Sequence, residues 1–476
     1  MIGAPLAAPL LPSWRAERIL YDEAGLLVVD KPPGIPVHGG DESLGEGLVD
    51  RLGVWLAAHG RPTYLGVHGR LDEPTSGALL FTTDESRNLE VARSREEGTL
   101  KRIYRALVRI SPSARLAESG RIELLLDADR GRSRVVERGG KRAVTHYHVL
   151  ERRGDLALVE LSLETGRTHQ IRVSLAYVGA PVMGDVEYGG EPAERLFLHA
   201  AELSGAPLPT VVTSPMPEAF VARLEGRSIR ARLRDSLLDA ALLRAPLPSR
   251  TTAFRLCNGE GDGIPGLVVD GYGPYAALGV YDEALLPHLD DVQATLEEIG
   301  YRSAYLKQRV RADLRTENAA ELAPELPLFG EPAPTELIVE EYGMQIAVSL
   351  ADGLSTGLFV DQRDNRQKLH AVSADKRLLN LFCYTGSFSV TAARAGARTT
   401  SVDLSGRALA RAKRNFELNS LALEGHQFFK DDAMKYLERA VRRGEVFDRI
   451  VLDPPSFATV GKGTFSVKGR YQEAAT

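Results

Sequence analysis

The chain has 476 residues, which is too long for one hydrophobic core and predicts two to four domains of about 100 to 200 residues each. A hydrophobic content of 43%, a charged content of 26% and a mean hydropathy of -0.16 are typical of a globular protein, and two cysteines exclude a disulfide framework. The low cysteine count predicts a protein of the reducing cytoplasm. No run approaches the roughly 18 apolar residues of a membrane span.

The net charge of -5 weighs against a nucleic-acid partner, because affinity for nucleic acid usually comes from basic side chains that neutralise the phosphates. Local charge is more informative. Arg87 to Arg109 holds seven basic residues against three acidic ones, and Arg121 to Arg142 holds seven against four. Such stretches are either phosphate-binding surfaces or solvated faces, and composition alone leaves both interpretations open.

The N-terminal segment predicts a loose arm followed by β structure. Met1 to Pro12 is apolar but broken by three prolines, and it lacks the basic region of a signal peptide. Ile19 to Tyr21 and Leu26 to Asp30 predict two strands around a short turn, and the second strand ends at a Pro-Pro-Gly break.

A carboxylate on a tight turn is the main candidate for chemistry in the first half. Residues 68–77 read HGRLDEPTSG and precede the strand-like run Ala78 to Phe81. The carboxylate is Asp72, with a basic residue two positions before it and hydroxyl residues after it. Asp72 is therefore the first residue to mutate.

Two later segments add a tyrosine and an arginine. Asp84 to Gly98 predicts a helix, and Lys101 to Val108 alternates as a strand does, which puts Tyr104 on one face with Arg102 and Ala106. A strand tyrosine is ordinarily a core or edge residue. Farther on, a Thr-Gly turn leads into a helix from near His169 to Gly179, which projects Arg172 from its first turns.

These segments resemble RluA/RsuA-type pseudouridine synthases over roughly residues 15 to 225. The matching motifs are GRLD and TSG around Asp72, KxxYxAxV with Tyr104, and GRTHQIR with Arg172. The resemblance implies an α+β domain with a mixed, mainly antiparallel sheet. It also implies that Asp72 is catalytic, that Tyr104 stacks on the base and is a candidate proton acceptor, and that Arg172 pairs with Asp72.

The resemblance further implies residues that handle the flipped base. Leu198 is the apolar residue that closes the pocket, and either His68 or Arg70 fills the gap that the base leaves. The additional Gly69 between them leaves that choice open. Flipping a uridine out of structured RNA costs a few kcal/mol and needs such a closed pocket.

The chemistry agrees with these residue types. Isomerisation breaks the glycosidic bond, rotates the uracil and rejoins it through C5, and a buried carboxylate acts either as nucleophile or as proton acceptor. A cation such as Arg172 keeps that carboxylate ionised. Neither a metal nor a cofactor is required, and the His and Asp residues show no metal-ligand spacing.

A charged helix with a proline break between Arg223 and Arg250 predicts a domain boundary. Residues 259–267 then read GEGDGIPGL, which resembles the small α+β linking (EEHUP-like) module of RlmI-type ribosomal RNA methyltransferases. The RNA-binding PUA domain that precedes this module in that family is not evident, so the synthase half takes its place.

The last part predicts a doubly wound nucleotide-binding sheet. Leu378 to Phe382 is a buried strand that opens through a small-residue turn into a helix, and the next strand, Thr399 to Val402, ends at Asp403. A carboxylate at that point binds a ribose diol in such sheets, although any nucleotide-binding unit has this pattern. An oxidoreductase is disfavoured because the turn lacks a GxGxxG loop.

With the FDRIVLDPPSF strand at 447–457 and the lead-in at 357–366, this part resembles a class I S-adenosylmethionine-dependent methyltransferase of the RlmI type. The resemblance implies a partial Rossmann-like fold and two sets of contacts. Cofactor contacts are expected from Arg363, Asn380, Phe382, Gly386, Asp403, Asp432 and Asp453. Contacts to the accepting base are expected from Pro454, Pro455 and Ser456.

The sequence departs from that family at its end. Thr476 follows the fourth strand by about twenty residues, so the later strands and the downstream cysteine of 5-methylcytosine-forming members are missing. Neither Cys257 nor Cys383 is assigned that role. We therefore expect a chain truncated after strand four, with an unpaired strand edge.

The sequence thus predicts a synthase at 1–225, a linker at 226–250, a linking module at 251–345 and a methyltransferase at 346–476. The expected partner is RNA, with large-subunit ribosomal RNA first and transfer RNA second, and no membrane. The cofactor is S-adenosylmethionine for the second half and none for the first. Cytosine C5 is the expected methyl acceptor in a complete chain. The alternative is an RNA-binding or ribosome-assembly protein with an inactive methyltransferase half; the target uridine and oligomeric state are open.

Overall fold

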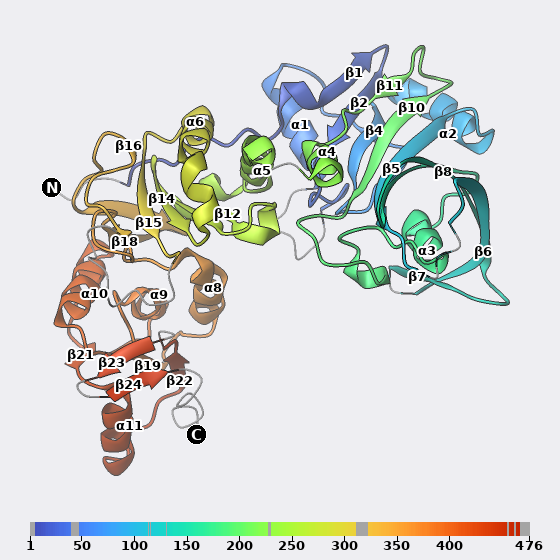
Figure 1. The fold of residues 1–476 in the computed structure, drawn as a ribbon. Coiled ribbons are helices and arrows are strands. Elements are labelled where there is room, and N and C mark those ends of the chain that lie inside the picture. Colours follow the sequence, from blue (N-terminus) through green and yellow to red (C-terminus); the bar gives the residue numbers. More distant parts are fainter. Residues whose placement is uncertain are drawn as a thin grey trace.

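A computed structural model describes residues 5–39, 47–112, 114, 116–129, 131–226, 230–310, 322–454, 457–460 and 463–466. Figure 1 shows an N-terminal domain with one long curved sheet, a smaller linking module and a C-terminal domain. No helix in these ranges is long and apolar enough to cross a membrane.

The N-terminal domain is built on an eleven-stranded sheet in the order β1-β2-β4-β10-β5-β9-β8-β6-β7, with β3 beside β4 and β11 beside β10. Only β4 and β10 pair in parallel, which confirms the predicted mixed, mainly antiparallel sheet. The strands are β1 Ile19–Glu23, β2 Leu26–Lys31, β3 Gly66–Val67, β4 Ser76–Thr82, β5 Lys101–Arg109, β6 Ser119–Asp129, β7 Arg132–Val135, β8 Lys141–Arg153, β9 Leu156–Leu163, β10 Leu198–Ser204 and β11 Val212–Thr213. The helices are α1 Leu48–Ala58, α2 Asn88–Glu96, α3 Gln170–Tyr177 and α4 Glu218–Glu225.

Strand β4 lies between β2 and β10, and all seven of its residues are buried. Its parallel neighbour β10 approaches closely at Gly77, where a Cβ would lie 2.2 Å from the carbonyl oxygen of Ala200. The φ of +115° at Gly77 also favours glycine. Gly77 therefore lets the loop before β4 pack directly against β10.

The linking module contains a five-stranded sheet, β12-β13-β14-β15-β16, followed by a β17-β18 hairpin. Helix α6 connects the parallel pair β14 and β15. The bounds are β12 Ala253–Asn258, β13 Leu267–Tyr272, β14 Tyr275–Val280, α6 Leu289–Ile299, β15 Ser303–Gln308, β16 Phe329–Gly330, β17 Leu337–Glu341 and β18 Met344–Val348.

From residue 5 onward the N-terminal arm packs against the rest of the chain, so the predicted loose arm is wrong for the described residues. Ala8 and Leu11 are buried in the core of the linking module, whereas Trp14 lies in the core of the N-terminal domain. These apolar residues share a core with residues more than 220 positions away in sequence, from Leu233 onward. Apolar surface that looks unpartnered in the sequence is thus removed from water by a distant module.

Helix α5 (Arg230–Leu243) lies in the segment predicted to be a linker and contributes to two cores. Leu233 and Leu237 pack in the linking module, whereas Leu242 packs in the N-terminal domain. Polar contacts fix its C-terminal part. Arg18 bridges Asp30 (2.6 Å) and Asp239, Arg51 donates to the carbonyl oxygens of Leu242 and Leu243, and Arg244 donates to Asp262 (2.8 Å).

The C-terminal domain has a parallel sheet in the order β21-β20-β19-β22, which confirms the predicted doubly wound fold. Helices α8 to α10 lie toward the linking module and α11 lies beyond the opposite face of the sheet (Figure 1). The bounds are α8 Arg363–Ala371, β19 Arg377–Leu381, α9 Ser387–Arg394, β20 Arg398–Asp403, α10 Gly406–Leu418, β21 Gln427–Lys430, α11 Ala433–Arg442 and β22 Arg449–Leu452, and the β23 Phe457–Val460 and β24 Gly463–Ser466 hairpin follows. Within the described ranges β22 pairs with β19 alone.

Candidate functional sites

The loop around Asp72 joins β3 to β4 and is fixed by a buried lysine. The backbone N–H of Thr75 donates to the carbonyl oxygen of Asp72 at 2.9 Å, which closes a turn. The Nζ of Lys31, which is fully buried, donates to the carbonyl oxygens of Glu73 (2.8 Å) and Ile35 (2.8 Å). Burial lowers the pKa of Lys31 to about 7. Lys31 thereby ties the Asp72 turn to the proline turn after β2.

Arg172 faces Asp72 with one nitrogen, because its others are engaged. Its Nε and Nη2 donate to the two oxygens of the fully buried Asp185 at 2.8 and 2.7 Å, and Nη2 also donates to Glu187 at 2.8 Å. Its Nη1 lies 3.7 Å from Oδ2 of Asp72. Burial acts to lower the pKa of Arg172, but the hydrogen bond and charge of Asp185 raise it overall. The predicted Asp72–Arg172 pair is thus brought together by a third residue.

His169 and Tyr188 complete the surroundings of this pair. The Nε2 of His169 lies 3.8 Å from Oδ2 of Asp72, and its Nδ1 lies 2.9 Å from the hydroxyl of Tyr188. The guanidinium of Arg172 stacks over the Tyr188 ring at 4.9 Å from its centroid. In the described part of the chain, no three His, Cys, Asp or Glu side chains are arranged to hold a metal ion.

Tyr104 and Leu198 lie on the neighbouring strands β5 and β10. Tyr104 is 7% exposed, and its hydroxyl accepts a hydrogen bond from Nη1 of Arg102 at 3.2 Å, so the two side chains share a face as predicted. Leu198 is 3% exposed and pairs with Ala106 across the strands. Both are core residues as well as candidate pocket residues.

The two candidates for filling the flipped-base gap differ in their environments. His68 is half-buried, its Nε2 lies 3.0 Å from Oγ1 of Thr82, and burial lowers its pKa. Arg70 is exposed and has no hydrogen-bond or ion-pair partner among the described residues. Arg70 is therefore the side chain that is free to extend from the loop.

Sequence reasoning missed the residues that support this site. Asp185 and Glu187 lie just beyond the helix that bears Arg172, outside the predicted motifs. Lys31 and His199 read as ordinary strand residues, although His199 is fully buried with its Nδ1 2.9 Å from Oγ of Ser76. The sequence signal that could have identified them is a charged or polar residue at a position where the strand pattern predicts a buried side chain.

The candidate cofactor residues gather at the carboxyl edge of the parallel sheet. Phe382 and Gly386 follow β19, Asp403 ends β20, Asp432 follows β21, and Asp453 follows β22. The carboxyl ends of parallel strands meet at one edge, which is where such sheets bind ligands. Asp453 is exposed and precedes Pro454. Pro455 and Ser456, which are also predicted to face the base, lie outside the described residues.

Asp403 connects the first two strand ends. Its Oδ2 accepts the backbone N–H of Tyr384 at 2.8 Å, and its Oδ1 accepts that of Ser405 at 2.8 Å. The turn that follows β19 is tight, and Phe382 and Gly386 within it have left-handed backbone conformations. Each carboxylate oxygen of Asp403 keeps a further lone pair for a ligand hydroxyl.

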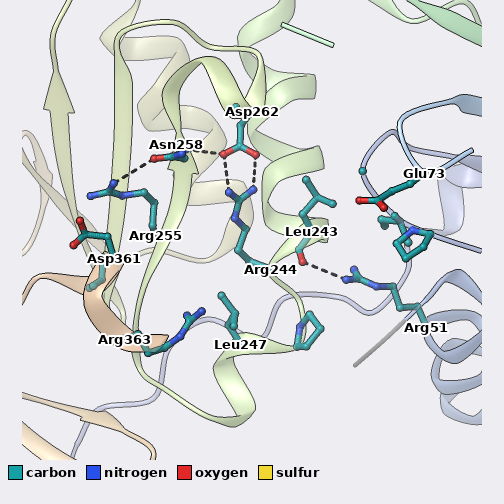
Figure 2. Close-up of a pocket in the computed structure, with 16 residues that line it drawn as sticks. Arg51, Glu73, Leu243, Arg244, Leu247, Arg255, Asn258, Asp262, Asp361 and Arg363 are labelled. Atoms are coloured by element: carbon teal, nitrogen blue, oxygen red, sulfur yellow. Dashed lines mark hydrogen bonds and ion pairs between the residues drawn. The ribbon is translucent and has the colours of Figure 1, made fainter. Parts of the chain in front are cut away.

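Asn380 is 2% exposed, and its Nδ2 donates to Oγ of Ser389 at 2.9 Å. It therefore braces β19 against α9. Arg363 begins α8 and is only 12% exposed at its side chain. Figure 2 shows Arg363 and Asp361 on one side of a cavity of about 610 Å³, with Arg51 and Glu73 of the N-terminal domain on the other. Arg363 thus lies at the junction of the three parts of the chain.

Comparison with known proteins matches the two halves of the chain to two different families. Residues 25–177 match the family model described as RNA pseudouridylate synthase. Residues 267–474 match the family model described as S-adenosylmethionine-dependent methyltransferase. The matches cover the Asp72 loop and the parallel sheet respectively.

Individual relatives match one half at a time. Ribosomal RNA large subunit methyltransferase I of Aeromonas salmonicida is 37% identical over 221 residues, which cover 45% of this chain and 54% of that protein. A ribosomal RNA large subunit methyltransferase of Deinococcus radiodurans is 37% identical over 237 residues, which cover 48% and 57%. The solved structure of human RNA Pseudouridylate Synthase Domain Containing 4 is 26% identical, with a TM-score of 0.37, and covers 44% of this chain and 92% of that one. The chain spans less than two thirds of the two methyltransferase relatives.

Proposed function

We propose that this chain, which joins a domain of the RNA pseudouridylate synthase family to a domain of the S-adenosylmethionine-dependent methyltransferase family, modifies RNA with both halves. Large-subunit ribosomal RNA is the first candidate substrate, because the methyltransferase relatives carry it in their names, and transfer RNA is the second. The two cysteines are buried and unpaired, which supports the reducing cytoplasm as the place of action.

The first half isomerises uridine to pseudouridine. The observation that carries this proposal is the 3.7 Å approach of Arg172 to Asp72 at a site where Asp185 holds the guanidinium in place. The cation lies beside the carboxylate that attacks the sugar or accepts a proton. The C1′–N1 bond breaks, the uracil rotates, C5 joins C1′, and the C5 proton leaves while N1 gains one.

Two other side chains prepare the base. Tyr104 lines the pocket, and its hydroxyl, which already accepts from Arg102, is the candidate acceptor for the C5 proton. Arg70 fills the stack after flipping, because it is exposed and has no partner in the described ranges. All these groups are protein side chains, so this half needs no cofactor.

The experiment is tritium release from [5-³H]uridine in unmodified large-subunit ribosomal RNA transcripts, followed by mapping of the product. Asp72→Asn should abolish release, because the amide cannot act as a nucleophile or a base. Glu73→Gln is the matched control, since this neighbouring carboxylate is exposed and forms no ion pair with Arg172 among the described residues. If Asp72→Asn releases tritium like the wild type, Asp72 is not the catalytic carboxylate. If the wild type itself binds the RNA but releases no tritium, the RNA-binding or assembly alternative gains.

The second half binds S-adenosylmethionine and methylates a base, with cytosine C5 as the proposed acceptor in a complete protein. The donor set fits this cofactor: Asp403 for the ribose diol, Asp432 for the adenine amine, Phe382 for its ring, and Arg363 at the entrance. When bound, the cofactor supplies an electrophilic methyl group. Asn380 holds β19 against α9 through its hydrogen bond to Ser389. Asp453 and Pro454, at the end of β22, are the described residues proposed to face the incoming base.

A further inference from the structure

Three arginines around the Asp72 loop lack a carboxylate partner in the described part of the chain: Arg70, Arg95 and Arg102. Other arginines of the same sheet are paired, as Arg109 is with Asp155. Cations held close together without a counter-ion repel one another, so such an arrangement favours binding of an anion.

The fold brings Arg95 and Arg102 together through a short turn. Arg95 lies in the last turn of α2 and Arg102 near the start of β5. The backbone N–H of Thr99 donates to the carbonyl oxygen of Ser94 at 2.9 Å, which reverses the chain between them. Burial and then the charge of Arg102 lower the pKa of Arg95, and no carboxylate counteracts this.

Arg102 also lies against the catalytic loop. A Cβ at Gly69 would lie 3.3 Å from its Nη2, so the absence of a side chain at Gly69 leaves room for the guanidinium. Its Nη1 donates to Tyr104, while its Nε is buried and has no hydrogen-bond partner. A buried donor without a partner is unfavourable, so within the described residues the Arg102 guanidinium is only partly satisfied by its hydrogen bond to Tyr104.

We propose that Arg95 and Arg102 bind a backbone phosphate of the RNA beside the uridine at Asp72. Guanidinium groups present paired N–H donors that match phosphate oxygens, and phosphate contacts fix the register of a nucleic acid on a protein. This inference rests on the proposed synthase function and adds the group that positions the nucleotide. Gly69, which has no assigned role in the sequence motif, permits the site.

The test is equilibrium binding of a fluorescently labelled RNA stem–loop with a single loop uridine to Asp72→Asn protein, which does not turn the RNA over. Arg95→Gln should weaken binding about 5- to 10-fold and reduce the slope of log K against log salt by about 0.7. Arg93→Gln on the same helix is the matched control, because Arg93 is exposed and, two positions from Arg95, projects from a different face of the helix. It should leave both quantities nearly unchanged.

A second arm identifies the ligand. Replacing a phosphate that flanks the uridine by a neutral methylphosphonate should weaken binding to the parent protein and to Arg93→Gln, but not further to Arg95→Gln. Equal sensitivity of all three proteins, or an unchanged salt slope in Arg95→Gln, overturns the site. Failure of the synthase proposal is seen separately, as absence of tritium release by wild-type protein that still binds the RNA.

Discussion

Asp185→Asn tests whether a residue that does not touch the substrate sets the geometry of the reaction centre. Asp185 is fully buried and receives two hydrogen bonds from Arg172, which is itself only 6% exposed at its side chain. Removing one partner of a buried ion pair costs about 3 to 5 kcal/mol. Because Glu187 still accepts from Nη2, we expect the lower end of that range, about 3 kcal/mol.

The loss of activity should exceed what unfolding explains. Asparagine offers one acceptor and an NH₂ group that opposes the guanidinium, so Nη1 of Arg172 is no longer aimed at Asp72. A misplacement of that kind lowers kcat by about 10- to 100-fold with little change in KM. Asp185→Glu should recover part of the loss, because it restores the charge.

Stability of this domain is measurable by urea unfolding followed by tryptophan fluorescence, since Trp14 and Trp55 both belong to the N-terminal domain. The control is Asp155→Asn, which breaks an exposed pair with Arg109 and should change stability by less than about 1 kcal/mol. The reasoning is refuted if Asp185→Asn keeps both the unfolding midpoint and the kcat of the wild type.

Three further outcomes are expected. Burial and then the charge of Arg195 lower the pKa of His199 to about 3, so between pH 6.5 and 3 the unfolded chain binds a proton that the folded chain does not. About 2 kcal/mol of stability should therefore be lost between pH 8 and pH 5. In urea titrations His199→Asn should remove this pH dependence, whereas the exposed control His148→Asn should keep it. Asp403→Ala should weaken S-adenosylmethionine binding by about 10- to 100-fold in calorimetry and leave tritium release from uridine unchanged, and equal loss of both would contradict separate sites. Gly77→Ala should destabilise the N-terminal domain by more than about 3 kcal/mol. Gly98 also has a positive φ, but a Cβ there would meet no atom within 4 Å, so Gly98→Ala should cost about 1 kcal/mol in the same unfolding assay.

Local sequence determined the elements and the main chemical groups. Period-two alternation and proline or glycine breaks predicted β2 and β5, and the carboxylate after a turn predicted Asp72. The strand that ends at Asp403 and the small-residue turn before it predicted the parallel sheet. These features depend on neighbours within about ten positions, so they can be read without knowing what packs against them.

Only the tertiary structure decided which groups act together. Asp185 and Asp72 are more than 100 positions apart, yet they hold opposite ends of the Arg172 guanidinium, and no local pattern encodes that pairing. The N-terminal arm and α5 looked like a loose end and a linker, because their apolar residues had no visible partner. Burial is a property of the assembled chain, so the distant core that covers Leu11 and Leu242 appears only in three dimensions.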